Sequence, residues 1–210
     1  MLSKPAPTSS PPAPPPLDVA ALPTFLVSAQ QVSTLLNGVQ LNALEVAASL
    51  GSDVSISPAK CASAVAPALT STYTDSGNTG VAVQGLREAS PGRHKVIQSV
   101  VVFPDDAAAQ RFYAQQVAAW QDCRMTDVTV SFANGQPDQD AKITIVLDSE
   151  GIASTVLLPA GVTDHPDSQC DRAMGRQRNV IVDVRVCGQN TITVGVRLVR
   201  AINENISRRS

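Results

Sequence analysis

Aromatic side chains are scarce in this sequence: they make up 3% of its 210 residues, whereas apolar residues together make up 43%. The core must therefore be built mainly from valine, alanine, leucine and isoleucine. Positive charge is also in short supply, because 16 lysines and arginines stand against 18 acidic residues. A nucleic-acid-binding protein normally carries a basic stripe, so nucleic acid is not an expected partner.

Long apolar runs are missing as well, since no window approaches the 18 or so consecutive apolar residues that cross a bilayer. Residues 1–16 also lack the charged-then-apolar pattern of a signal peptide and hold seven prolines. Such a composition favours an extended spacer over a packed structure. We interpret residues 1–21 as a disordered Pro-rich spacer and 22–210 as one folded domain. The segment that exports or tethers the domain is expected upstream of residue 1.

Apolar spacing and capping residues predict the secondary structure of the folded part. Helices are expected over residues 29–36, 58–70, 105–121 and 189–205, the last with an inner stripe of Ile192, Val196, Val199, Ile202 and Ile206. Strands are expected over residues 79–88, 95–103, 128–132, 142–148, 152–158, 169–175 and 179–187. Residues 41–56 stay ambiguous, with a helix over 44–50 or a strand near 54–56. Consecutive strands on short turns predict an α+β fold: an antiparallel sheet of about six strands with helices packed on it.

Metal and thiol chemistry have little support. The four cysteines show neither the close spacing of metal ligands nor a C-x-x-C redox motif, and the only histidines are His94 and His165. His165 has carboxylate neighbours, but a loop with a proline and two aspartates is typical of a turn. No nucleophile elbow and no phosphate-binding glycine loop occur. We therefore expect no metal, no cofactor and no enzymatic activity.

Disulfide formation is the favoured interpretation of the cysteines. Cys170 and Cys187 lie symmetrically about the step between residues 178 and 179, so a hairpin turning there would place the two sulfurs opposite each other. This leaves Cys61 to pair with Cys123. Two stable disulfides indicate an oxidising compartment outside the cytoplasm.

Several short motifs, in order, resemble one known family. They are FLVS at 25–28, Cys61, VIQSVVVFP at 96–104, WQDC at 120–123, and Cys170 followed by NVIVDVRVCG at 179–188. Together they resemble the PknH-like extracellular sensor domains of mycobacteria, which occur in transmembrane Ser/Thr kinases and as free-standing lipoproteins.

The resemblance implies a single α+β domain with the same two bridges and a sizeable cleft for an unidentified ligand. It also implies a membrane tether upstream, either a transmembrane helix or a lipidated cysteine. We therefore expect an extracytoplasmic, envelope-anchored sensor that binds a small envelope or host molecule. A cell-envelope hydrolase or transferase, and a structural protein-interaction module, are the alternatives.

Four side chains are candidate ligand contacts. In the hairpin register, Arg172 and Arg185 lie directly opposite each other, and this unfavourable pair of like charges would be relieved by Asp183 or by a bound anion. The competing and favoured interpretation is a solvated sheet face from which both guanidinium groups point away. Tyr73 and Trp120 are large rings in an aromatic-poor chain and could line a cleft, although the helix stripe places Trp120 more readily in the core.

Overall fold

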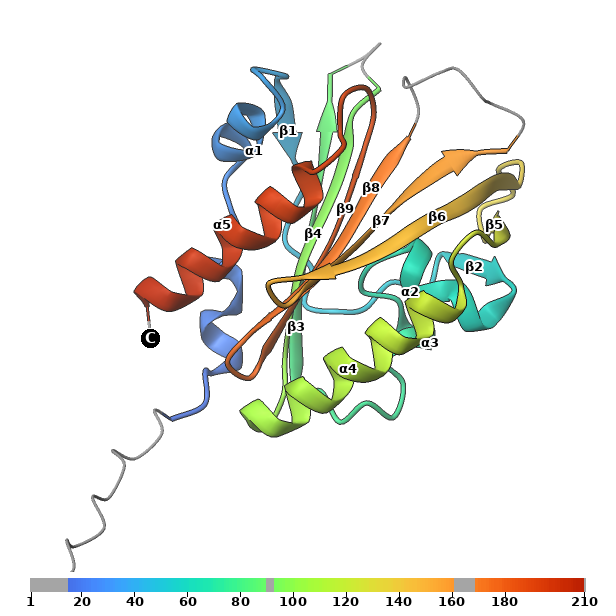
Figure 1. Ribbon diagram of the computed structural model, residues 1–210. Coiled ribbons are helices and arrows are strands. Elements are labelled where there is room, and N and C mark those ends of the chain that lie inside the picture. The colour runs from blue at the N-terminus through green and yellow to red at the C-terminus, as the bar shows by residue number, and fades with distance from the viewer. Residues whose placement is uncertain (1–14, 90–92, 161–168, 210) are drawn as a thin grey trace, which may run out of the picture.

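The computed structural model describes residues 15–89, 93–160 and 169–209 (Figure 1). Groups of helices and groups of consecutive strands follow one another along these residues in an α+β arrangement. The helical elements are η1 (Val19–Thr24), α1 (Ala29–Leu35), η2 (Ala59–Cys61), α2 (Ala62–Val65), α3 (Thr70–Tyr73), α4 (Asp106–Asp122) and α5 (Val194–Arg208). The strands are β1 (Leu41–Ala43), β2 (Val54–Ser57), β3 (Gly80–Glu88), β4 (Lys95–Val102), β5 (Asp127–Phe132), β6 (Gln139–Ser149), β7 (Ile152–Pro159), β8 (Cys170–Gln177) and β9 (Val180–Cys187).

The strands of the described residues form one sheet in the order β1-β3-β4-β9-β8-β7-β6-β5-β2, and every neighbouring pair is antiparallel. The predicted α+β class is confirmed, whereas the expected count of about six strands was too low. β1 and β2 are three and four residues long and lie at the two edges of the sheet; β1 was not predicted, and β2 was predicted only as one of two alternatives for its region. Strands this short carry too little alternation to be assigned uniquely from a sequence.

Alternating side chains give the sheet two buried faces. On β9, Val182 and Val184 point to one face, while Ile181 and Asp183 point to the other. The first face is covered by η1, α1 and α5, and the second by α2, α3 and α4 (Figure 1). We call these the α5 face and the α4 face.

The α5 helix begins later than the sequence suggested. Thr193 adopts a left-handed conformation and α5 starts at Val194, so Ile192 lies before the helix and is 58% exposed. Its assignment to the inner stripe was wrong, because the stripe begins only where the helical period begins. Leu198, which the predicted stripe omitted, is fully buried with Val199, Ile202 and Ile206.

The helix expected over residues 58–70 is broken into η2, α2 and α3. Pro67 lacks a backbone N–H and disfavours helical conformation in the preceding residue, and Ala66 is accordingly extended at φ −131° and ψ 135°. Ala68 then takes a positive φ of 51°. The chain can therefore turn between α2 and α3 and lay both short helices on the α4 face.

Residues 44–50 form no helix either, because their backbone pairs with β3 through Ala47 and Val83. The alternative for this region, a strand near 54–56, is confirmed by β2. At the β6–β7 hairpin, Glu150 and Gly151 both have positive φ, as a tight two-residue turn of this kind requires.

The fold begins before the boundary at residue 22. Leu17 and the side chain of Asn179 exchange two hydrogen bonds: the Leu17 N–H donates to Asn179 Oδ1 at 2.9 Å, and Asn179 Nδ2 donates to the Leu17 carbonyl at 3.3 Å. Residues 17–21 therefore belong to the folded part. Residues 1–14 of the predicted spacer, and residues 161–168, which include His165, lie outside the described residues.

Candidate functional site

Three of the four predicted ligand contacts come together inside the α4 face. Tyr73 donates a hydrogen bond from its hydroxyl to Asp183 Oδ2 at 3.0 Å, and Arg172 forms an ion pair with Asp183 Oδ1 at 2.5 Å. The guanidinium of Arg172 lies 4.8 Å from the centre of the Trp120 ring, within cation–π range. All four side chains are at most 2% exposed. We call these four residues the buried cluster.

Arg172 is almost completely satisfied by internal partners. Its Nη1 donates to the carbonyls of Ala173 and Val184, and its Nη2 donates to the carbonyl of Ser63. The favoured expectation of a solvated sheet face is therefore wrong for Arg172. The physical reason is that α2, α3 and α4 cover this face, and Asp183 supplies the counter-charge that burial of a guanidinium requires.

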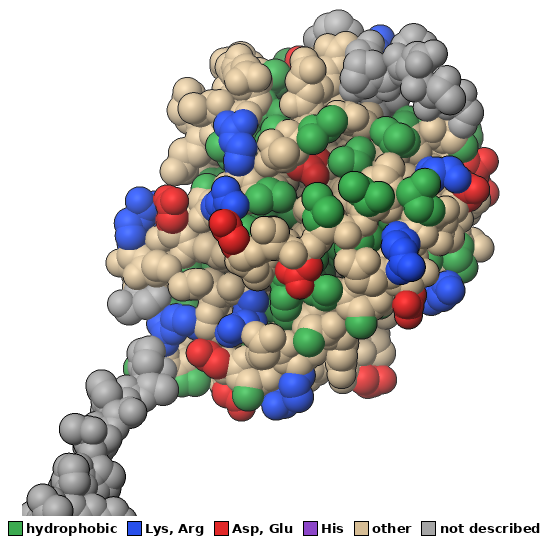
Figure 2. All heavy atoms as spheres, viewed as in Figure 1, with side chains coloured by type: hydrophobic (Ala, Val, Ile, Leu, Met, Phe, Trp, Pro, Cys, Tyr) green, Lys and Arg blue, Asp and Glu red, His purple; other side chains and the backbone are tan. Residues whose placement is uncertain are grey.

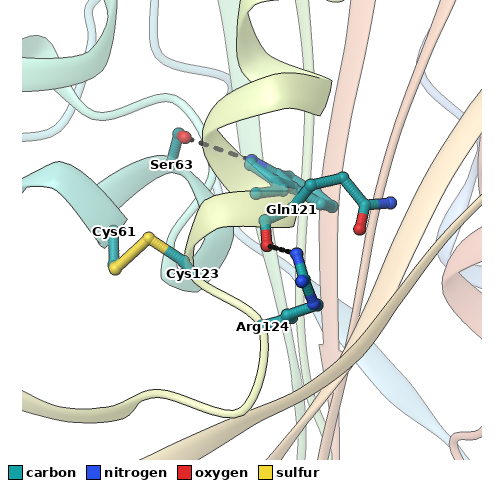
Figure 3. The surroundings of a disulfide bond; sticks show 6 residues. Cys61, Ser63, Gln121, Cys123 and Arg124 are labelled. Atoms are coloured by element: carbon teal, nitrogen blue, oxygen red, sulfur yellow. Dashed lines mark hydrogen bonds between the residues drawn. A yellow bond between two sulfur atoms is a disulfide. The ribbon is translucent and has the colours of Figure 1, made fainter.

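The Cys61–Cys123 disulfide lies near Ser63, which contacts the buried cluster through Trp120 (Figure 3). It joins the end of η2 to the residue that follows α4, and Ser63 Oγ beside it accepts a hydrogen bond from Trp120 Nε1 at 3.1 Å. The second bridge links Cys170 to Cys187 across the β8–β9 hairpin, in the predicted register. Both predicted pairings are confirmed.

Tyr73 stays a neutral hydrogen-bond donor at all ordinary pH values. Burial raises its pKa well above the usual value, and the adjacent carboxylate of Asp183 raises it further. Its ring also stacks on Phe112, with 4.7 Å between the ring centres. The contacts of Tyr73, Trp120 and Arg172 are thus internal to the fold, and a direct ligand contact for them stays a prediction.

Arg185 is the predicted contact that reaches open space. It lines two adjoining pockets on the α4 face, of about 390 Å³ and about 550 Å³, and is only partly buried. Val130, Gln139 and Cys170 also line both pockets. We call the combined space the Arg185 pocket.

The sheet register explains where this pocket lies. One row of neighbouring residues runs across four strands: Lys95 on β4, Cys187 on β9, Cys170 on β8 and Leu157 on β7. Arg185 lies two residues before Cys187 on β9, opposite Arg172 and on the same face of the sheet. The row of the hairpin disulfide is therefore part of the pocket lining, and the end of α2 contributes a wall residue, Val65.

Arg185 is a cation without a carboxylate partner among the residues that the structure describes. Its Nη1 donates a hydrogen bond to the Val65 carbonyl at 3.3 Å. Burial lowers its pKa to about 10, and the positive charge of Arg172 contributes to the lowering. The side chain therefore remains charged at neutral pH, at the wall of a pocket and opposite a second guanidinium.

Sequence reasoning missed most of the other pocket residues. Lys95 and Gln139 come from β4 and β6, and Val65 comes from α2. These elements are far apart in the chain, and no local motif connects them. Only the strand register, which sequence analysis obtained for β8 and β9 alone, could have placed Arg185 beside the others.

His94 is engaged by two oxygen acceptors. Its Nδ1 lies 2.7 Å from Glu88 Oε2 and its Nε2 lies 3.1 Å from the Gln189 carbonyl. Within the described residues, neither ring nitrogen faces a serine, threonine or cysteine nucleophile. Asp105, which is followed directly by Asp106, caps α4 by accepting a hydrogen bond from the Ala108 N–H at 2.7 Å. These contacts give the hydrolase alternative no support.

The described residues contain no group of three or more His, Cys, Asp or Glu side chains placed to hold a metal ion. None of their helices has the length and apolar character needed to cross a bilayer.

Comparison with known proteins extends the picture. The model of the PknH-like extracellular domain matches residues 17–205, which is nearly the whole described chain. The chain belongs to this family. Its PknH-like domain is 26% identical over 203 residues to serine/threonine-protein kinase PknH of Mycobacterium bovis and, equally, to that of Mycobacterium tuberculosis. The alignments cover 94% of this chain but only 33% and 31% of the two kinases, so the chain spans about a third of their length.

A solved structure has the same fold. The PknH-like domain resembles the crystal structure of the extracellular domain of PknH from Mycobacterium tuberculosis, with a TM-score of 0.85 and 22% sequence identity. The match covers 92% of this chain and 98% of that one. All of this similarity is to the extracellular part of a kinase, and it provides no evidence of catalysis in the PknH-like domain.

Proposed function

We propose that this PknH-like domain is an extracytoplasmic sensor that binds a small envelope or host molecule in the Arg185 pocket. The pocket volumes of about 390 and 550 Å³ fall within the range usual for small-molecule sites. The domain would be tethered to the mycobacterial membrane by an upstream segment, either a transmembrane helix or a lipid anchor. Its family relationship to kinase ectodomains supports this placement.

The observation that carries the proposal is the charge of Arg185. A partly buried guanidinium that has no carboxylate partner in the described chain is costly to keep unless a ligand shares its electrostatics. The neighbouring Arg172 differs, because Asp183 neutralises it. In this proposal the two opposed arginines have different roles: Arg172 is part of the core and Arg185 faces the ligand.

In this proposal no ligand contacts Tyr73, Trp120 or Arg172 directly, and these residues form part of the core beside the pocket. Direct contact between them and a ligand would require α2, α3 and α4 to move away from the sheet, because all three side chains are buried beneath these helices. Held in place by Asp183 and by the Cys61–Cys123 bridge, they keep the wall of the pocket rigid.

A thermal-shift screen against envelope lipids, glycans and anions tests the proposal. A true ligand raises the melting temperature by mass action. The variant Ala141→Phe, which fills the pocket wall, should abolish the shift, whereas Ala114→Phe on the exposed side of α4 should leave it intact. A shift that persists in Ala141→Phe would place the ligand elsewhere and refute the proposal.

The interaction-module alternative has one observation in its favour. Hydrophobic side chains gather on the surface over the strands beside α5 (Figure 2). Ile145 and Leu147 on β6 are 61% and 56% exposed, which is unusual for side chains of this size. Sedimentation of the wild type and of an Ile145→Glu/Leu147→Glu variant would separate the two functions, since self-association lost only in the variant would support a docking surface.

A further inference from the structure

We infer that the Arg185 pocket takes an anionic amphiphile, with a carboxylate or phosphate headgroup at Arg185 and Lys95 and an apolar chain along the pocket wall. This inference rests on the proposed function and adds the chemical class of the ligand. The inference depends on three features of the pocket: its charge, the spacing of its cations and the apolar lining of its smaller cavity.

Positive charge prevails in the pocket lining. Among the described residues, Arg93, Lys95 and Arg185 line it, against one acidic side chain, that of Asp140. Asp140 Oδ1 accepts a hydrogen bond from Thr129 Oγ1 at 2.6 Å, and its one negative charge is outnumbered by the three cations. A neutral or cationic headgroup would therefore leave Arg185 without a counter-charge, whereas an anion would supply one.

The two principal cations are placed to share one headgroup. Lys95 pairs with Cys187 in the β4–β9 register, and Arg185 lies two residues before Cys187 on the same strand. Lys95 and Arg185 are therefore diagonal neighbours on adjacent strands and point to the same face, about 7–8 Å apart. A headgroup with two or three acceptor oxygens can bridge that interval, with the guanidinium binding two of them.

The smaller of the two cavities has a largely apolar lining. Val65, Leu157 and Val130 lie around it, together with Ala141 and Pro159. The lining available to a ligand therefore changes from charged in the larger cavity to aliphatic in the smaller one, and Arg185 borders both. A headgroup alone would leave this wall hydrated, whereas an aliphatic chain attached to it would remove the wall from water.

The test uses four amphiphiles with the same dodecyl chain, all below their micelle concentrations. Dodecanoate and dodecyl phosphate are the anionic probes, and they distinguish a carboxylate from a phosphate headgroup. Monododecanoyl glycerol is neutral and dodecyltrimethylammonium is cationic. Calorimetric titration of the wild type should show that at least one anionic probe binds tenfold or more tightly than the neutral one, with an affinity that falls as NaCl is added.

Three pocket variants and one control variant test the inference. Arg185→Gln should weaken the anionic probe by about tenfold or more, and Arg185→Lys should restore part of the affinity because it keeps the charge. Lys95→Gln, at an exposed side chain, tests the same headgroup with little risk to the fold. Arg200→Gln, an exposed α5 residue paired with Glu150, is the control and should bind like the wild type.

Three results would overturn the inference. They are equal binding of the neutral and anionic probes, unchanged anion affinity in both Arg185→Gln and Lys95→Gln, and absence of binding by every probe. Equal binding of the neutral probe that is lost in Ala141→Phe would leave the proposed function standing without its anionic class. An envelope ligand whose thermal shift persists in Ala141→Phe would instead refute the proposed function itself.

Discussion

Replacing Arg172 with methionine should be strongly destabilising. The substitution removes the cation that pairs with the carboxylate of Asp183, which is fully buried. Removing one partner from a buried ion pair costs about 3–5 kcal/mol, because the remaining charge is left uncompensated in a medium of low dielectric constant. For a domain of this size, that loss corresponds to a fall in melting temperature of roughly 10 °C.

A double-mutant cycle separates the ion pair from simple loss of packing. Asp183→Asn keeps an oxygen that accepts from the Tyr73 hydroxyl and the Ala68 N–H, which donate to Asp183 at 3.0 and 2.9 Å. It leaves the guanidinium of Arg172 unpaired instead. The double variant Arg172→Met/Asp183→Asn has neither buried charge, so it should lose less stability than the sum of the two single variants, by about 1–3 kcal/mol.

Urea unfolding followed by tryptophan fluorescence is a suitable assay. Trp120 is the only tryptophan in the chain and packs against the guanidinium of Arg172. Because Arg172→Met also changes the emission of Trp120 directly, transition midpoints should be compared, with circular dichroism as a second probe.

Arg200→Met is the matched control. Arg200 forms an ion pair with Glu150 at 2.6 Å, but both side chains are more than half exposed. Exposed pairs of this kind contribute about 0–1 kcal/mol. If Arg172→Met costs no more than Arg200→Met, or if the double-mutant cycle shows no coupling, the account of the buried cluster is wrong.

Three further predictions concern the rest of the fold. Burial raises the pKa of Asp171 to about 7; the folded state therefore binds its proton more tightly than the unfolded state, and stability should fall as pH rises from about 4 to about 7, by up to about 4 kcal/mol. Asp171→Asn should lack this component, and identical pH profiles of wild type and variant by denaturant titration would contradict the assignment. Gly175→Ala should cost about 1–3 kcal/mol, because its Cβ would come within 2.5 Å of a valine side chain of α5, whereas Gly51→Ala meets only a carbonyl oxygen at 3.8 Å and should be tolerated; equal melting temperatures would refute the close approach of α5. Replacing Cys61 and Cys123 together with serine opens a loop with a sequence separation of 62 and should lower stability by about 4 kcal/mol in the loop-entropy model, which thermal unfolding with and without reductant can check.

Local features of the sequence determined much of the fold. The β8–β9 register follows from the symmetric cysteines, because a hairpin fixes every cross-strand pair once its turn is known. The same register places Arg172 opposite Arg185. The capping aspartate of α4 and the tight β6–β7 turn are equally local, since each depends on a few adjacent residues.

Burial of the same residues could not be read from the sequence. The register shows that Arg172 and Arg185 share a face, but not that the helices α2, α3 and α4 cover Arg172 while Arg185 remains at a pocket wall. That difference depends on where α2 ends and where the chain turns at Pro67, and on contacts between segments more than a hundred residues apart, such as the bond from Ala68 to Asp183.

The sequence by itself therefore determined the class of the fold, the Cys170–Cys187 pairing and the register of their hairpin, which arise from local alternation and turn geometry, and it left Cys61 to pair with Cys123 by elimination. Only the tertiary structure decided which of two opposed arginines is neutralised in the core and which faces a pocket. Charge compensation depends on distance and dielectric environment in three dimensions, and neither is encoded in residue spacing along the chain.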